Sequence, residues 1–233
     1  GILRWDFQAG DEIYTPVVVD GIAYAGSRDG HLRAFDAQTG IVHWDFRYGS
    51  RIYIPVVMDG VAYSGSSDGH LRALDAKTGQ VRWESQFGDR VFNSVVVNGT
   101  IYAGSRNGHL RALDAKTGQV RWESQTGDEI TITSTVVDEV VYVMLFRGVQ
   151  AFDAQTGAVR WNFRGDLINH LLVVDGLVYA GSDSHLRVFN AQTGELHWDF
   201  KADNKALNIL SKPPNYFTEK LIYIMQIDRL MAI

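Results

Sequence analysis

Cysteine is absent from the 233 residues of this chain. That absence excludes disulfides, zinc–thiolate sites and thiol catalysis, and it fits either a reducing or an oxidising compartment. Long apolar runs are also missing, because no stretch approaches the roughly 18 residues that span a bilayer. Residues 1–20 lack the basic, apolar and small-residue zones of a signal peptide. The sequence therefore predicts neither a transmembrane segment nor a targeting peptide.

Basic residues are also fewer than acidic residues. The chain has 22 Lys and Arg against 27 Asp and Glu, and its formal net charge is −5. Phosphate binding needs a basic surface that releases counterions, so this balance argues against a nucleic-acid partner. Hydrophobic residues make up 45% of the chain, which is enough apolar side chain for the core of a globular domain.

The most informative feature that is present is a repeat. The six tryptophans are Trp5, Trp44, Trp83, Trp122, Trp161 and Trp198. Their successive spacings are 39, 39, 39, 39 and 37 residues, and six tyrosines keep the same phase. These are Tyr24, Tyr63, Tyr102, Tyr142, Tyr179 and Tyr223. A fixed period of about 20 to 50 residues is typical of stacked repeats, among them solenoids and propellers.

One repeat has the pattern of four short antiparallel strands. In the first complete unit, residues 15–19 form an apolar run, and Asp20-Gly21 is a two-residue hairpin signal. Further strand patterns follow at 22–27, 31–36 and 41–46. A four-stranded unit cannot bury both faces alone, so neighbouring units must stack. The expected fold is all-β, a closed six-bladed β-propeller with four antiparallel strands in each blade.

The two ends of the chain resemble parts of one blade. The segment GILRW at 1–5 matches GIVHW at 40–44, where a fourth strand starts. Residues 221–233 match a second and a third strand. We therefore expect the N-terminal strand, residues 1–7, to complete the last blade together with about 206–233. The result would be a single domain spanning 1–233 with no open sheet edge.

A motif links the repeats to a known family. The pattern Ala34-x-Asp36-x-x-Thr39-Gly40-x-x-x-Trp44 recurs in later repeats, with a weaker copy ending at Trp198. It resembles the tryptophan docking motif of the quinoprotein dehydrogenase propellers, which use pyrroloquinoline quinone, and of the bacterial outer-membrane-assembly lipoprotein propellers. The resemblance implies that each indole stacks over the glycine turn of a neighbouring blade while its N–H finds a backbone acceptor. It thus implies a structural role for the six tryptophans and a location in the bacterial envelope.

The resemblance does not extend to the cofactor site of the enzymes. The dehydrogenases typically have eight blades, an adjacent-cysteine disulfide under the quinone and a calcium ion, whereas this chain offers six repeats and no cysteine. We therefore expect no cofactor and no catalytic residue. Four histidines, His31, His70, His109 and His185, each start a third strand in a different blade. Metal bonds of roughly 2 Å cannot reach across whole blades, so we expect no metal site there.

Candidate binding residues lie where the repeats differ. The connections from each fourth strand to the next blade vary most, and we expect them on one face of the disc around its axis. They supply Tyr14, Arg51, Tyr53, Arg90, Phe92, Asn93, Asn169 and His170. Apolar walls with a few polar groups are typical of ligand sites. The alternative is that these side chains only plug the central opening.

A second candidate surface involves the loops between second and third strands. In the fourth and sixth repeats these loops abandon the Gly-Ser-x-Asp-Gly pattern of the other repeats. Leu145, Phe146 and Ile227 stand there instead. If exposed, they form an apolar patch of the kind that marks contact with a partner protein.

These observations favour a non-catalytic propeller that binds a protein or small ligand on its loop-rich face. It would act as an envelope scaffold or as a sensor domain, either as a monomer or as one domain of a larger protein. One alternative is a quinone-dependent dehydrogenase. Another is an engineered or recently amplified repeat protein with no selected ligand, suggested by the identical stretch LRALDAKTGQVRWESQ at 71–86 and 110–125.

Overall fold

The computed structural model describes residues 3–201, 207–211, 222–226 and 229–232. These residues form 23 strands, and the predicted all-β class is confirmed. No helix long and apolar enough to cross a membrane occurs in the part of the chain that is described. The chain divides into two compact units, unit 1 (Gly1–Thr133) and unit 2 (Ser134–Ile233).

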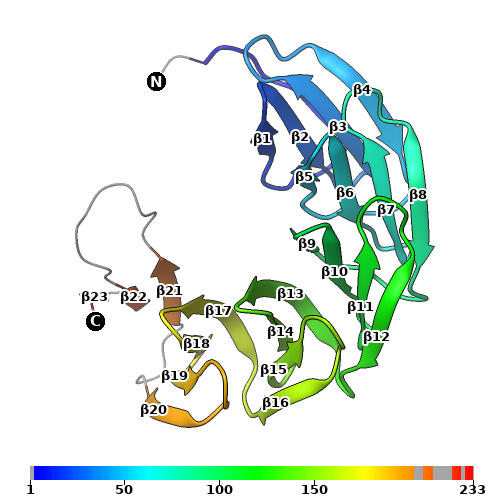
Figure 1. The fold of residues 1–233 in the computed structure, drawn as a ribbon. Helices are drawn as coiled ribbons and strands as arrows, with labels where there is room; N and C mark the ends of the chain where they lie inside the picture. Colours follow the sequence, from blue (N-terminus) through cyan, green and yellow to red (C-terminus); the bar gives the residue numbers. More distant parts are fainter. Residues whose placement is uncertain (1–2, 202–206, 212–221, 227–228, 233) are drawn as a thin grey trace. The chain divides into compact units, whose positions relative to one another are not determined.

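Unit 1 contains three four-stranded antiparallel sheets, each made of consecutive strands (Figure 1). The first comprises β1 (Val17–Val19), β2 (Ile22–Gly26), β3 (His31–Asp36) and β4 (Val42–Arg47). The second comprises β5 (Val56–Met58), β6 (Val61–Gly65), β7 (His70–Asp75) and β8 (Val81–Gln86). The third comprises β9 (Val95–Val97), β10 (Thr100–Gly104), β11 (His109–Asp114) and β12 (Val120–Gln125). One sequence repeat therefore corresponds to one sheet, or blade.

Unit 2 holds most of two further four-stranded sheets and one sheet of three strands. The fourth blade comprises β13 (Ile130–Val137), β14 (Val140–Leu145), β15 (Gly148–Asp153) and β16 (Val159–Arg164). The fifth comprises β17 (Ile168–Val174), β18 (Leu177–Ser182), β19 (His185–Asn190) and β20 (Leu196–Lys201). The three-stranded sheet comprises β21 (Leu207–Ser211), β22 (Ile222–Gln226) and β23 (Arg229–Ala232).

The structure corrects the predicted number of complete blades. Five sheets have four strands and the sixth has three, so the described residues form five complete blades and not six. Residues 3–7, expected to be the missing strand, form no strand. A strand from the opposite end of the chain has no hairpin turn to set its register, and its pairing carries the largest loop-closure entropy. Closure and the single-domain organisation therefore remain predictions.

Two kinds of turn recur in the five four-stranded blades. The hairpin Asp20-Gly21 has φ angles of 49° and 76° and joins β1 to β2, as the left-handed requirement of a two-residue turn predicts. Between β3 and β4, the carboxylate of Asp36 accepts hydrogen bonds from the N–H groups of Gln38 and Thr39. It also accepts one from the Thr39 hydroxyl. These local bonds fix the register of the neighbouring strands.

The hairpin between β13 and β14 departs from this pattern. Glu139 has a φ of 59°, where the equivalent residues of four other hairpins are glycines. This left-handed conformation costs an L-residue roughly 1–2 kcal/mol. Replacing Glu139 by glycine should raise the free energy of unfolding by about 1 kcal/mol, because the substitution removes only an exposed hydrogen bond from Gln155. Urea denaturation measures the change, and Gly99→Glu should have the opposite effect. Equal stability of all three proteins would contradict this reasoning.

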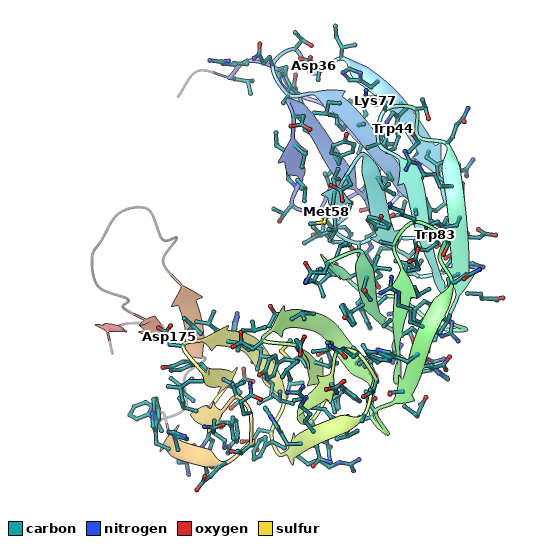
Figure 2. The ribbon with its side chains drawn as sticks, in the orientation of Figure 1. Asp36, Trp44, Met58, Lys77, Trp83 and Asp175 are labelled. Atoms are coloured by element: carbon teal, nitrogen blue, oxygen red, sulfur yellow. The ribbon has the colours of Figure 1, made fainter. Side chains whose placement is uncertain are left out.

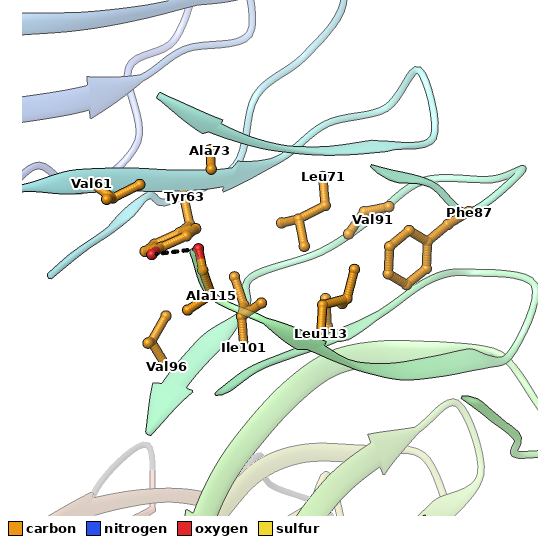
Figure 3. Packing of buried hydrophobic residues seen from close by; sticks show 11 residues of the cluster. Val61, Tyr63, Leu71, Ala73, Phe87, Val91, Val96, Ile101, Leu113 and Ala115 are labelled. Carbon is orange, nitrogen blue, oxygen red and sulfur yellow. Dashed lines mark hydrogen bonds between the residues drawn. The ribbon is translucent and has the colours of Figure 1, made fainter. Parts of the chain in front are cut away.

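The hydrophobic core lies between successive blades and not inside one of them. In Figure 3, Tyr63 and Leu71 of the second blade face Ile101 and Leu113 of the third. Leu71, Ile101 and Leu113 are fully buried. A pleated sheet has two faces, so each repeat buries its apolar residues only by packing against its neighbours.

The Asp-x-x-Thr-Gly turns are charged as well as hydrogen-bonded. Asp114 accepts a hydrogen bond from the guanidinium of Arg121 at 2.8 Å. This bond, followed by the bonds from Thr117 and Lys116, lowers the pKa of Asp114 to about 2. In the fifth blade, Asn190 makes the backbone part of the same turn without a charge.

Asp114→Asn should therefore fold, and it should change how stability depends on pH. The pKa of Asp114 is lower in the folded protein than the value of about 3.9 in an unfolded chain. The ionised carboxylate thus stabilises the fold above about pH 4, and this contribution is lost as the pH falls toward about 2. In thermal melts, the Tm of the variant should fall less than that of the wild type across this interval. Parallel curves would contradict the assignment.

Candidate functional site

Four tryptophans lie on the turn of the next blade, and the contact is the same each time. The indole N–H of Trp44 donates to the carbonyl of Ala76 at 2.9 Å. A Cβ added at Gly79 would lie 2.8 Å from the same ring. Figure 2 labels Trp44 and, on the next blade, Trp83. The equivalent sets are Trp5 with Ala37 and Gly40, Trp83 with Ala115 and Gly118, and Trp161 with Ala191 and Gly194. These indoles hold blades together and are not available to a ligand.

A tyrosine hydroxyl donates to the same carbonyl, a role that the sequence reasoning missed. Tyr63 donates to Ala115 at 3.0 Å (Figure 3), where Trp83 also donates at 3.0 Å. Tyr24 and Tyr142 bond in the same way to Ala76 and Ala191. A carbonyl oxygen has two lone pairs and can accept both donors. The constant phase of tyrosine and tryptophan along the chain was the signal for this pairing.

The repeated His-Leu-Arg segments form ion pairs between third and fourth strands. His31 Nδ1 lies 2.6 Å from one carboxylate oxygen of Asp45, and Arg33 Nε donates to the other at 2.9 Å. The guanidinium of Arg33 also lies over the ring of Phe7, 5.3 Å from its centroid. Groups of three or more His, Asp or Glu that could hold a metal ion are not found among the described residues. We therefore interpret His31 and Arg33 as structural residues that link the third and fourth strands of the blade.

Three of the predicted binding residues meet in one row in unit 1. The rings of Tyr14 and Tyr53 are stacked, with centroids 6.2 Å apart and planes 22° apart. The rings of Tyr53 and Phe92 are tilted at 52°, with centroids 5.3 Å apart. Each residue is held at the same point of its blade, because its N–H donates to a glycine carbonyl on the second strand. All three side chains are half-buried. We call Tyr14, Tyr53 and Phe92 the aromatic row.

Two predicted arginines have side chains without an ion-pair partner in the described part of the chain. Arg51 and Arg90 each stand two residues before a member of the aromatic row. By contrast, Arg106 pairs with Glu129 at 3.0 Å. Burial raises the pKa of Tyr14, and the charge of Arg51 acts in the opposite direction. A cation is thus close to the row.

The remaining predicted residues are distributed over both units. Asn93 follows the row in unit 1 and is half-buried. Asn169 and His170 lie on β17 in unit 2, where the Asn169 amide donates to Asp183 at 2.5 Å and His170 pairs with Gly181 in the ladder. Within unit 1 the structure therefore brings Tyr14, Tyr53 and Phe92 together, and a shared site with Asn169 and His170 remains a prediction.

The predicted partner patch is corrected at Leu145. Its side chain is only 2% exposed, because Leu145 is the last residue of β14 and pairs with Gly148 across a tight two-residue turn. Phe146, in that turn, is 44% exposed as expected, and the guanidinium of Arg147 lies 5.9 Å from its ring centroid. Ile227 lies outside the described residues.

Comparisons with known proteins point to one class of repeat. A family model described as outer membrane protein assembly factor BamB matches residues 126–233. BamB from Moraxella catarrhalis is 23% identical, with a TM-score of 0.79, and the match covers 98% of this chain and 74% of that chain. The computationally designed Ika8 protein is 20% identical, with a TM-score of 0.80, covering 95% and 71%. A quinohemoprotein alcohol dehydrogenase, ADHIIG from Pseudomonas putida HK5, is 21% identical, with a TM-score of 0.67, covering 87% and 43%. A search of curated proteins found no match.

At these identities the solved structures establish the fold alone, since one fold hosts many functions. The family match covers β13 and the strands that follow it, and the tryptophan motif extends the same repeat to the earlier blades. The resemblance seen in the sequence is confirmed for residues 126–233, which match the family model, and the solved structures support the same propeller fold for the rest of the chain.

Proposed function

We propose that the chain is a non-catalytic scaffold that binds a protein segment along the aromatic row of unit 1. The observation that carries this proposal is the row of neighbouring rings of Tyr14, Tyr53 and Phe92, together with Arg51, whose side chain has no ion-pair partner among the described residues. Tyrosine, phenylalanine and arginine are enriched at protein interfaces. The matched family is described as an outer membrane protein assembly factor, which supports a protein partner and a location at the outer membrane.

The spacing of the row favours an extended peptide. Successive ring centroids are 6.2 and 5.3 Å apart, close to the roughly 6.6 Å between alternate residues of a β-strand. Alternate apolar side chains of such a peptide would each meet a ring. The guanidinium of Arg51, which forms no ion pair within the described residues, favours a carboxylate in the same peptide, because charge-assisted hydrogen bonds to arginine are strong and directional.

Selection of a phage-displayed peptide library on the full chain tests this proposal. Peptides with alternating apolar residues and an acidic residue should be enriched. Tyr53→Ala should weaken their binding by about 30-fold, as expected for a central interface residue worth about 2 kcal/mol. Phe200→Ala removes an exposed aromatic side chain of β20 in unit 2 and is the matched control. Failure to enrich any peptide, or undiminished binding by Tyr53→Ala, would favour the alternative of an amplified repeat without a selected ligand.

A quinone-dependent dehydrogenase is the second candidate, supported by the likeness to the quinohemoprotein alcohol dehydrogenase. The residues do not fit the cofactor. The chain has no cysteine for the adjacent-cysteine disulfide, and three metal-ligating side chains converge nowhere in the described part. Dye-linked alcohol oxidation with added pyrroloquinoline quinone and calcium provides the test. A rate above that of the cofactor alone would replace the scaffold proposal.

We also propose the six-bladed closure, and the shared register of the blades gives it a specific form. Tyr223 lies opposite Ala232, as Tyr24 lies opposite Ala34, and Ala34 in turn lies opposite Trp44. A fourth strand from residues 3–7 would by the same register place Trp5 opposite Ala232 and Asp6 opposite Met231. Because the chain lacks cysteine, an Asp6→Cys, Met231→Cys pair is a clean test. Intramolecular disulfide formation is expected, and its absence would contradict closure.

A further inference from the structure

Two Asn-Gly pairs occur in unit 1, and the structure holds them differently. They are Asn98-Gly99 and Asn107-Gly108. The amide of an asparagine is lost most readily before a glycine, because glycine has no side chain to hinder attack of its own nitrogen on that amide. Reaction therefore requires that the asparagine side chain and the following N–H are both free to move.

Asn107 is held by hydrogen bonds at both atoms of its amide. Its Oδ1 accepts from the hydroxyl of Ser105 at 2.6 Å, and its Nδ2 donates to the carbonyl of Phe87 at 3.1 Å. The N–H of Gly108, whose nitrogen would have to attack, donates to the carbonyl of Ser105 at 3.0 Å. These hydrogen bonds must break before Asn107 can react, and each of them opposes the reaction.

Asn98 lies at the exposed tip of a hairpin. It is the first residue of the two-residue turn between β9 and β10 (Figure 1), and Val97 pairs with Thr100 across this turn. Asn98 and Gly99 are both exposed, and nothing lies within 4 Å of a Cβ added at Gly99. The strand β9 pairs with β10 through only three residues, so the hairpin end can open while the rest of the blade stays folded.

The equivalent hairpins of other blades already carry the residue that loss of the amide would produce. Three of them begin with aspartate, at Asp20, Asp59 and Asp175, with φ angles of 49°, 50° and 50°. The φ of Asn98 is 49°. Aspartate thus adopts the left-handed conformation that this turn requires, and its formation at Asn98 would retain the hairpin while adding one negative charge.

We propose that Asn98 is a deamidation site of the folded protein and that the fold protects Asn107. The nitrogen of Gly99 gives up its proton and attacks Cγ of Asn98. A C–N bond forms, the bond from Cγ to Nδ2 breaks, and ammonia leaves with that proton, so a five-membered succinimide remains. Water then adds to one of the two ring carbonyls and breaks its C–N bond, which yields aspartate or isoaspartate. No atom is oxidised or reduced, and water is the only co-reactant. The site does not rest on the function proposed above.

Incubation of the full chain in mildly alkaline buffer, followed by trypsin digestion and mass spectrometry, tests the proposal without any variant. Trypsin places the two asparagines in separate peptides, because Arg106 lies between them. In the folded protein Asn98 should convert at least about tenfold faster than Asn107, since only Asn107 must break its hydrogen bonds. In urea the two rates should become similar, because glycine follows both residues. Equal rates in the folded protein, or an Asn98 that reacts only in urea, overturns the proposal.

Two variants examine the separate steps of the argument. Ser105→Ala removes the hydroxyl that bonds to Asn107, so it should speed conversion of Asn107 by about threefold and leave the rate at Asn98 unchanged. Asn98→Asp creates the product directly and should melt at the same Tm as the wild type. A clearly lower Tm, or an unchanged rate at Asn107 in Ser105→Ala, would contradict the corresponding step. These outcomes are independent of the Tyr53→Ala experiment.

Discussion

Gly79→Ala is expected to lower the free energy of unfolding by about 3 kcal/mol. Gly79 has a φ of 71°, and an added Cβ would lie 2.8 Å from the indole of Trp44. The backbone conformation alone costs an L-residue roughly 1–2 kcal/mol. Displacing the buried ring adds a further cost of about 1–3 kcal/mol, because the ring also holds a hydrogen bond to Ala76. Urea denaturation followed by far-UV circular dichroism measures the sum.

Gly60→Ala is the matched control for this experiment. Gly60 has the same φ of 71°, but nothing lies within 4 Å of an added Cβ. Its substitution should therefore show the backbone cost alone, about 1–2 kcal/mol. The difference between the two variants is the contribution of the contact between indole and turn. If both variants lost the same stability, the tryptophan contact would not hold the blades together.

Local chemistry accounts for the parts of the fold that could be predicted. The expected strand at 31–36 is β3, His31–Asp36, and those at 22–27 and 41–46 differ from β2 and β4 by one residue at one or both ends. Two-residue hairpins and Asp-x-x-Thr-Gly turns set these bounds within a few residues of sequence. Closure depends instead on contacts between residues far apart along the chain, and no local signal fixes them.

The candidate site was likewise predictable only in part from the sequence. Tyr14, Tyr53 and Phe92 were found because they stand where the repeats differ, yet their ring contacts depend on the distance between blades. Leu145 is buried and not exposed because the fourth blade has a two-residue turn that extends the strand through this residue, and the loop pattern of the other repeats does not indicate such a turn. The role of the tyrosine hydroxyls requires the position of a carbonyl in another blade, which spacing along one chain does not give.

Gly65 lies where the second and third blades pack together next to the aromatic row. Gly65→Ala should therefore lower the stability of the fold and also disturb the row. An added Cβ would overlap the carbonyl oxygen of Val91 and lie 2.6 Å from that of Phe92. These are backbone atoms of the next blade, so no change of rotamer relieves the clash. The φ of Gly65 is not positive, so the whole cost, about 3 kcal/mol, comes from forcing two blades apart.

The displacement should separate the ring of Phe92 from that of Tyr53, because Tyr53 stays attached to Gly65 through its N–H at 3.1 Å. Near-UV circular dichroism under native conditions reports this pair, and its aromatic signal should weaken together with binding of the selected peptides. Gly60→Ala, in the same blade, should lose stability without changing either reading. A Gly65→Ala protein with an unchanged near-UV spectrum and full peptide binding would mean that the row does not depend on the spacing of the blades. In that case, contacts other than the close approach of successive blades at Gly65 would hold the two rings together.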